Sequence, residues 1–377
     1  MQSRIIENID QVAPQDWDRC VTSAISGFNP FCSYGFLSAL EESGCVSAHT
    51  GWLPQHVILE NNNEVIGVLP MYLKNHSKGE YVFDHAWANA YYQAGGVYYP
   101  KLQCSIPFSP VTGPRLLASD MTAREILLEA AIKHAEVSNV SSLHFTFIEN
   151  DELDIMKSHG LLYRTDQQFH WINNEYKNFE QFLCALSSRK RKNIKKERMC
   201  LQENDIEIEQ LNGTAIQEHH WDAYFTFYMD TADRKWGRPY LNRDFFSLMS
   251  QNMSEKILLI MAKRDGKYIA GALNLIGPKT LYGRYWGATE HYKFLHFELC
   301  YYQAIDYAIS NGLTRVEAGA QGDHKIARGY VPVLTKSAHW IANPAFKDAI
   351  KKYLAHERKA VERDVEFLSD FAPFKKS

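Results

Sequence analysis

Short apolar runs separated by polar turns dominate the first half of the chain. Residues 55–60 and 65–73 are apolar runs flanking an asparagine triplet, which favours a β-hairpin. Apolar residues recur near helical spacing over 122–138, which predicts a helix. The other elements expected here are strands at 80–87, 142–148 and 163–172 and a short helix at 152–159.

The second half repeats this order of elements. Two apolar runs, 257–262 and 268–276, flank Asp265-Gly266, a strong hairpin signal. The expected elements after them are strands at 281–287, 314–318 and 333–341, helices at 296–310 and 347–367, and a loop or short helix at 322–329. Two rounds of strand meander, helix and strand predict an α/β (α+β) architecture with mixed sheets.

Chain length and composition agree with two domains. The 377 residues exceed one ordinary core, and the 45% hydrophobic and 23% charged fractions are typical of a globular protein. We expect an N-terminal domain over 1–175 and a C-terminal domain over 176–377 that includes the basic helix at 187–201 and the helix at 347–367. The formal net charge of -3 means that no whole-chain field attracts nucleic acid or an anionic membrane.

The cysteines and the N-terminal residues indicate in which cellular compartment to expect the protein. Seven cysteines form no CxxC pair, and the first residues lack an apolar signal core. No apolar run approaches the ~20 residues that span a bilayer. We therefore expect reduced cysteines, no transmembrane segment and a cytoplasmic protein.

A basic segment at 187–201, with the sequence SSRKRKNIKKERMCL, lies between the halves. It has too few apolar positions for a deeply buried helix, so it is either a solvated face or a positive stripe that binds a partner. Such a stripe suits phosphate groups, as in a nucleotide-linked substrate, the CoA diphosphate, RNA or lipid headgroups. We expect tRNA or CoA as candidate partners of residues 187–198.

Several familiar site motifs are missing. The chain has no P-loop, no GxGxxG after a strand and no GxSxG nucleophile elbow. HExxH and HxxxH zinc spacings are also missing, so no metal site is expected.

The segment 284–332 combines buried-type elements with an unusual density of polar groups. Burying such groups is costly unless they are paired or used. His296 and Glu298 lie at the start of the expected helix, where Glu298 is either a dipole partner or a proton acceptor. Glu317 lies in a short strand and is either paired with Arg284 or Arg315, or a base at the strand's end.

The loop after Glu317 carries a further set of polar groups. His324 has a pKa suited to proton transfer, and we expect it to be a catalytic candidate with His296, Glu298 and Glu317. A second group, RKWGRPY, combines cations with a tryptophan. The candidate binding residues are Arg284, Trp286, Tyr302, Gln321, Lys325, Arg328, Arg234, Lys235 and Trp236.

Long motifs give the chain a family resemblance. SSRKRKNIKKER, FYMDTADRKWGRPYL, YGRYWGATEHYKFLHFELCYYQAIDYAISNGL and EAGAQGDHKIARGYVP resemble the FemAB-like predicted N-acyltransferases, and NPFCSYGFLSALEESG and PFSPVTGPRLL extend the resemblance to nearly the whole chain. The resemblance implies two tandem GNAT-like acyltransferase folds joined by the basic helix. It also implies N-acyl transfer from acyl-CoA or aminoacyl-tRNA, used as co-substrate with no tightly bound cofactor, to a cell-wall precursor or small amine.

One departure from the acyltransferase pattern leaves the donor open. The CoA-cradling loop reads Arg/Gln-x-x-Gly-x-Gly/Ala, but Arg284-Tyr-Trp-Gly287-Ala-Thr289 differs at its last position and lies in an expected strand. The alternative function is a non-catalytic binding module for an anionic glycan, nucleotide or RNA. We expect any chemistry chiefly in the second half, since residues 87–142 lack its density of His, Glu and Lys.

Overall fold

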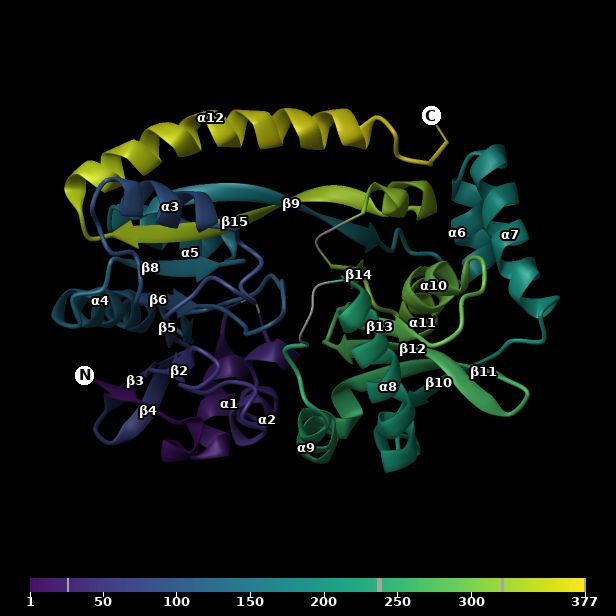
Figure 1. Ribbon diagram of the computed structural model, residues 1–377, viewed down its shortest axis with the longest axis horizontal. Helices are drawn as coiled ribbons and strands as arrows, with labels where there is room; N and C mark the ends of the chain where they lie inside the picture. Colours follow the sequence, from purple (N-terminus) through teal and green to yellow (C-terminus); the bar gives the residue numbers. More distant parts are fainter. Residues whose placement is uncertain (26, 236–238, 320–321, 376–377) are drawn as a thin grey trace. The chain divides into compact units, whose positions relative to one another are not determined.

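The computed structural model describes residues 1–25, 27–235, 239–319 and 322–375 (Figure 1). Two expected binding residues, Trp236 and Gln321, lie outside these ranges. Arg234 and Lys235 belong to a described helix, but their side chains are not among the described parts. Over the described residues, no helix is both long and apolar enough to cross a membrane.

The chain forms two compact units whose boundaries differ from the expected ones. The first comprises Met1–Asp166 and Leu334–Arg363, and the second comprises Gln167–Val333 and Asp364–Ser377. Residues 334–363 were expected in the second domain. They join the first unit because their apolar side chains, including Ala338, Ile350 and Leu354, pack in that unit's cores.

The first unit contains two sheets. One has the strand order β1-β3-β4-β7 (Gln2–Ile6, His56–Asn61, Glu64–Leu69 and Leu117–Ala118). The other has the order β15-β8-β6-β5-β2 (Val331–Ile341, Ser142–Thr146, Lys101–Cys104, Tyr72–Lys74 and Trp52–Pro54). The predicted hairpin is confirmed, since β3 and β4 pair antiparallel. The helices are α1 (Pro14–Ser23), α2 (Tyr34–Glu42), α3 (His85–Gln93), α4 (Met121–Val137), α5 (Asn150–Ser158) and most of α12 (Pro344–Ser369).

The second unit is built on the strand order β10-β11-β12-β13-β14-β9. These strands are Glu207–Asn212, Ile257–Arg264, Lys267–Ile276, Thr280–Ala288, Arg315–Glu317 and Leu162–Ile172. The helices are α6 (Phe179–Ala185), α7 (Ser188–Gln202), α8 (Glu218–Lys235), α9 (Arg243–Met253), α10 (Leu295–Phe297) and α11 (Gln303–Ser310). A π-helical turn, η5 (Glu298–Tyr302), joins α10 to α11, and a 3-10 turn, η6 (Asp323–Arg328), follows β14.

Alternation along β12 places helices on both faces of this sheet. Ala270 and Ala272 belong to the core that also contains α11 residues, whereas a side chain at Gly271 would meet Tyr224 of α8. The predicted α/β class with mixed sheets is thus confirmed. The basic helix, α7, lies inside the second unit, as expected for the C-terminal domain, because Ile194 and Leu201 are buried in that unit's core.

The first unit also holds a dense group of buried charges. The Lys101 ammonium donates to Glu80 at 2.7 Å and to Asp84, while Lys74 lies 3.4 Å from Glu80. All four side chains are at most 4% exposed. The strand expected at 80–87 is wrong: the carboxylates of this segment are drawn to the two lysines, and the segment ends in α3.

We expect Lys101→Met to destabilise the first unit strongly. Removal of this cation leaves two buried carboxylates without their main partner, a loss that typically costs about 3–5 kcal/mol of unfolding free energy. Urea unfolding of Lys101→Met measures the change, with Lys78→Met, an exposed lysine of the same unit, as control. Equal, small effects of both substitutions would contradict a structural role for this network.

Candidate functional site

The site begins where two parallel strands of the second unit stop pairing. β13 and β14 pair only from Thr280 with Arg315 to Tyr282 with Glu317. Just beyond, the register between β12 and β13 shifts, which marks a bulge at residues 284–285. Bulges re-aim side chains and occur often beside active sites. The bulge and the strand end thus hold Arg284 and Glu317 on adjacent strands.

Glu317 lies between two arginines, which we call the arginine–glutamate cluster (Arg284, Arg315 and Glu317). Its carboxylate oxygens lie 3.2 Å from Arg315 Nη2 and 3.8 Å from Arg284 Nη2. Both ion pairs considered for Glu317 are therefore present. Neither oxygen has a hydrogen-bond partner among the described residues, although the side chain is fully buried. Burial raises the pKa of Glu317 above its usual value, against the opposing effects of Arg315 and Arg284.

Two further titratable groups surround this cluster. Burial lowers the pKa of His170 to about 3, and the charges of Arg315, Arg284 and Lys325 act in the same direction. Lys325 is 2% exposed and donates to the Gly319 carbonyl at 3.0 Å. Burial lowers its pKa to about 8. The site therefore holds a neutral imidazole and an ammonium that is close to losing its proton.

Glu298 opens the π-helical turn η5. Its Oε1 accepts from Arg198 Nε at 3.1 Å and from Gln303 at 2.8 Å, while its Oε2 has no hydrogen-bond partner among the described residues. Burial raises the pKa of Glu298, and the Arg198 guanidinium opposes this shift. Turns of this kind are often found at functional sites. One oxygen of Glu298 thus accepts hydrogen bonds, whereas Glu317 accepts none from the described residues.

The two expected histidines meet in a group of rings, the aromatic–histidine cluster (Trp286, His296, Tyr301 and His324). The His296 ring centroid lies 5.0 Å from that of Trp286, 5.3 Å from Tyr301 and 6.0 Å from His324. The Tyr301 hydroxyl and His324 Nε2 are hydrogen-bonded at 2.9 Å. His324 is exposed, so it can exchange protons with solvent or a bound molecule.

Arg328 and Tyr302 share one acceptor, Glu197 of α7. Arg328 Nη2 donates to both carboxylate oxygens of Glu197, at 3.0 and 2.9 Å, and the Tyr302 hydroxyl donates to the same group. The Arg328 guanidinium also lies 3.3 Å from the Phe297 ring centroid. Arg328 and Tyr302 are therefore held by the protein itself and are not poised to bind an anion.

Most of the predicted site residues that the structure describes lie in the second unit. Electrostatic coupling through Lys325 links the arginine–glutamate cluster to η6, which carries His324 and Arg328.

Sequence reasoning missed two residues of the site, His170 and Glu197. A histidine in the apolar strand run QFHWI was one available signal. The other was the one acid among the basic residues of α7, placed at helical spacing from the buried Ile194.

This arrangement suits proton transfer and anion binding more than metal chemistry. A buried carboxylate with a raised pKa can accept a proton, and nearby cations can hold a negative group. Among the described residues, no three His, Cys, Asp or Glu side chains are grouped so as to hold a metal ion.

Comparison with known proteins gives the chain a family. A FemAB-like family model, described as peptidoglycan biosynthesis/recognition, matches residues 8–376. A crystal structure of FemX is similar, with a TM-score of 0.58 and 14% identity over 93% of this chain and 100% of that one. The C-terminal domain of a protein described as a lysylphosphatidylglycerol synthetase from Agrobacterium fabrum has a TM-score of 0.55 and 9% identity over 91% and 96%. No curated protein matches the chain.

These structural likenesses concern the fold alone, because the identities are low. They show that this chain shares the fold of the FemX structure.

We expect Lys325→Met to stabilise the protein at neutral pH. The pKa of Lys325 is about 8 instead of 10.5, so the folded protein binds fewer protons than the unfolded chain between these values. The cost of holding the charged lysine is therefore greatest below pH 8 and disappears as the pH rises. The substitution should raise the unfolding free energy at pH 7 by up to about 3 kcal/mol.

Urea unfolding at pH 7 and pH 10 tests this expectation, with the exposed Lys351→Met as control. A gain of equal size at both pH values, or a loss at pH 7, would show that burial of the ammonium is not the cause.

Proposed function

Because this chain belongs to the FemAB-like family, we propose that it is an N-acyltransferase. It moves an acyl or aminoacyl group from an activated ester or thioester to an amine. The observation that carries the proposal is Glu317, a buried carboxylate with both oxygens free of hydrogen bonds among the described residues and with a raised pKa. A group kept in that state is costly to the fold, and such cost is typical of functional sites.

The reaction needs a base because an amine is nucleophilic only after losing its ammonium proton. In our proposal Glu317 accepts this proton, and the amine nitrogen then attacks the donor carbonyl carbon. The tetrahedral intermediate loses its second nitrogen proton to solvent, and its oxyanion then collapses to form the amide and expels the donor's oxygen or sulfur atom. The leaving atom then takes up the proton that Glu317 accepted from the ammonium, which restores the carboxylate.

The cations around Glu317 supply the complementary electrostatics. The charge of Arg284 helps to lower the pKa of Lys325, and in our proposal the two cations together favour the negative charge that develops on the carbonyl oxygen. His324 is the second candidate for proton transfer, since it is exposed and hydrogen-bonded to Tyr301. Glu298 is the weaker candidate base, because Arg198 and Gln303 already occupy one of its oxygens.

The co-substrates follow from the family's description. We propose a cell-wall precursor or small amine as the acceptor, and acyl-CoA or aminoacyl-tRNA as the donor. Arg284-Tyr-Trp-Gly287-Ala-Thr289 lacks the last glycine or alanine of a CoA loop, and residues 284–288 lie in β13. This departure favours an aminoacyl ester over acetyl-CoA.

We expect Glu317→Gln to reduce turnover by about 10²–10⁴-fold, the usual contribution of a positioned base. His324→Ala should reduce turnover as well, and both variants should keep their fold by circular dichroism. Mass spectrometry of amide product measures turnover, with acyl-CoAs and aminoacyl-tRNAs offered against amine acceptors. Glu207→Gln, an exposed acid of the same unit, is the matched control.

Wild-type turnover in both Glu317→Gln and His324→Ala would sink the assignment. Thermal stabilisation by these donors without any product in the wild type would favour the alternative, a non-catalytic binding module.

A further inference from the structure

Helix α7 has two faces with different tasks. Ile194, Glu197, Arg198 and Leu201 recur at the spacing of one helical face, and this face contacts the body of the second unit. Through it, Glu197 binds Arg328 at 2.9 Å and Arg198 binds Glu298 at 2.9 Å. The inner face is therefore tied directly to the candidate site.

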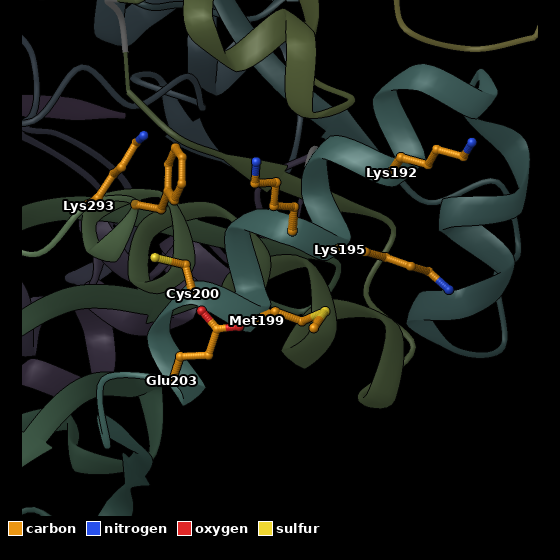
Figure 2. A pocket seen from close by; sticks show the side chains of 8 residues that line it. Lys192, Lys195, Met199, Cys200, Glu203 and Lys293 are labelled. Atoms are coloured by element: carbon orange, nitrogen blue, oxygen red, sulfur yellow. The ribbon is translucent and has the colours of Figure 1, made fainter.

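The outer face of α7 borders a cleft of about 370 Å³. Figure 2 shows Lys293 on one side of this cleft, and Lys192 and Lys195 on the helix that forms the other. The lining residues are Lys192, Lys195, Lys196, Met199, Cys200, Glu203, Lys293 and Phe294. A volume of this size suits a small organic ligand.

The lysines of the cleft are available for a ligand. Lys195 pairs with Glu180 at 2.9 Å, but among the described residues no carboxylate lies within ion-pair distance of Lys192, Lys196 or Lys293. Lysine ammonium groups sit on flexible four-carbon stems and can turn toward an anion. Phe294 and Met199 add an apolar wall beside these charges. The cleft thus combines several positive charges with a surface on which a flat ring can pack.

We propose that this cleft binds a nucleotide, with its phosphate groups on Lys192, Lys196 and Lys293 and its base against Phe294 and Met199. Phosphates favour clustered cations, and a base gains by stacking on an aromatic ring. An α-helix is about 10 Å across, so a ligand on the outer face is separated from Glu298 on the inner face by about the width of α7. Resting on the proposed function, we assign this nucleotide to the carrier of the acyl donor.

Calorimetric titration of the full-length protein tests the proposal. The probes are adenosine 3′,5′-bisphosphate, which is the nucleotide end of CoA, the trinucleotide CCA, which is the end of tRNA, and inorganic pyrophosphate. We expect one of the two nucleotide probes to bind more tightly than pyrophosphate, with an affinity that falls as salt rises. Whichever probe binds more tightly identifies the carrier, and the cleft is supported in either case.

Charge-matched variants locate the binding. Lys192→Glu/Lys196→Glu should weaken nucleotide binding by at least about tenfold, since each reversal replaces attraction by repulsion. Lys351→Glu/Lys352→Glu, with the same change of charge on exposed residues of α12, should bind as the wild type does. Phe294→Ala should weaken the nucleotide and leave pyrophosphate unchanged.

Three outcomes would overturn the proposal. These are no binding of any probe, equal loss in both double variants, and pyrophosphate binding as tight as that of the nucleotides. Failure here is distinct from failure of the proposed function, because the titration requires no turnover. Glu317→Gln should bind the nucleotide as the wild type does even though its turnover is lost.

Discussion

The short parallel pairing of β13 with β14 is the constraint from which the second unit's chemistry follows. Three residue pairs hold the two strands together, and the last of them contains Glu317. Just past this pair, the bulge in β13 redirects the chain at Arg284. The backbone thus fixes a buried carboxylate and a buried guanidinium on neighbouring strands. The charge of this guanidinium in turn helps to lower the pKa values of His170 and Lys325.

The two units pair their buried carboxylates to different degrees. In the first, Lys101 donates to one oxygen of Glu80 and one of Asp84, so each carboxylate accepts a hydrogen bond, while Glu80 Oε1 and Asp84 Oδ1 have no hydrogen-bond partner among the described residues. In the second, Glu317 has two arginines within 4 Å and yet accepts no hydrogen bond among the described residues. A network of the first kind serves stability. An incompletely paired carboxylate of the second kind lowers stability. Such a loss is tolerated where the group has a function.

Much of this organisation can be predicted from the sequence, and the failures have identifiable physical causes. The Asp265-Gly266 hairpin and the helix at 122–138 are fixed by local turn chemistry and periodicity, and the structure contains both. The strand expected at 80–87 fails because distant lysines determine where Glu80 lies. No local pattern reports a partner that comes from another strand.

The same reasoning applies to the candidate site. Glu298, Glu317 and Lys325 can be found from polarity inside apolar elements, and all three are buried. Glu197 cannot be found this way, because it lies in a predominantly basic segment and not in an apolar one. Its role appears only when α7 is folded, with the acid turned inward to Arg328 and the lysines turned outward.

The charged residues on the two faces of α7 have different roles. A basic run on a solvated helix usually contributes little to stability, because exposed charges are screened. Here Arg198 forms an ion pair with Glu298, and Glu197 forms one with Arg328. These two residues of α7 therefore help to hold the site together. What remains for a partner is the smaller set of lysines around the cleft. A ligand that draws these lysines together would act on the same helix that holds Glu298 and Arg328. Donor binding and the geometry of the candidate catalytic groups would then be coupled through one rigid element.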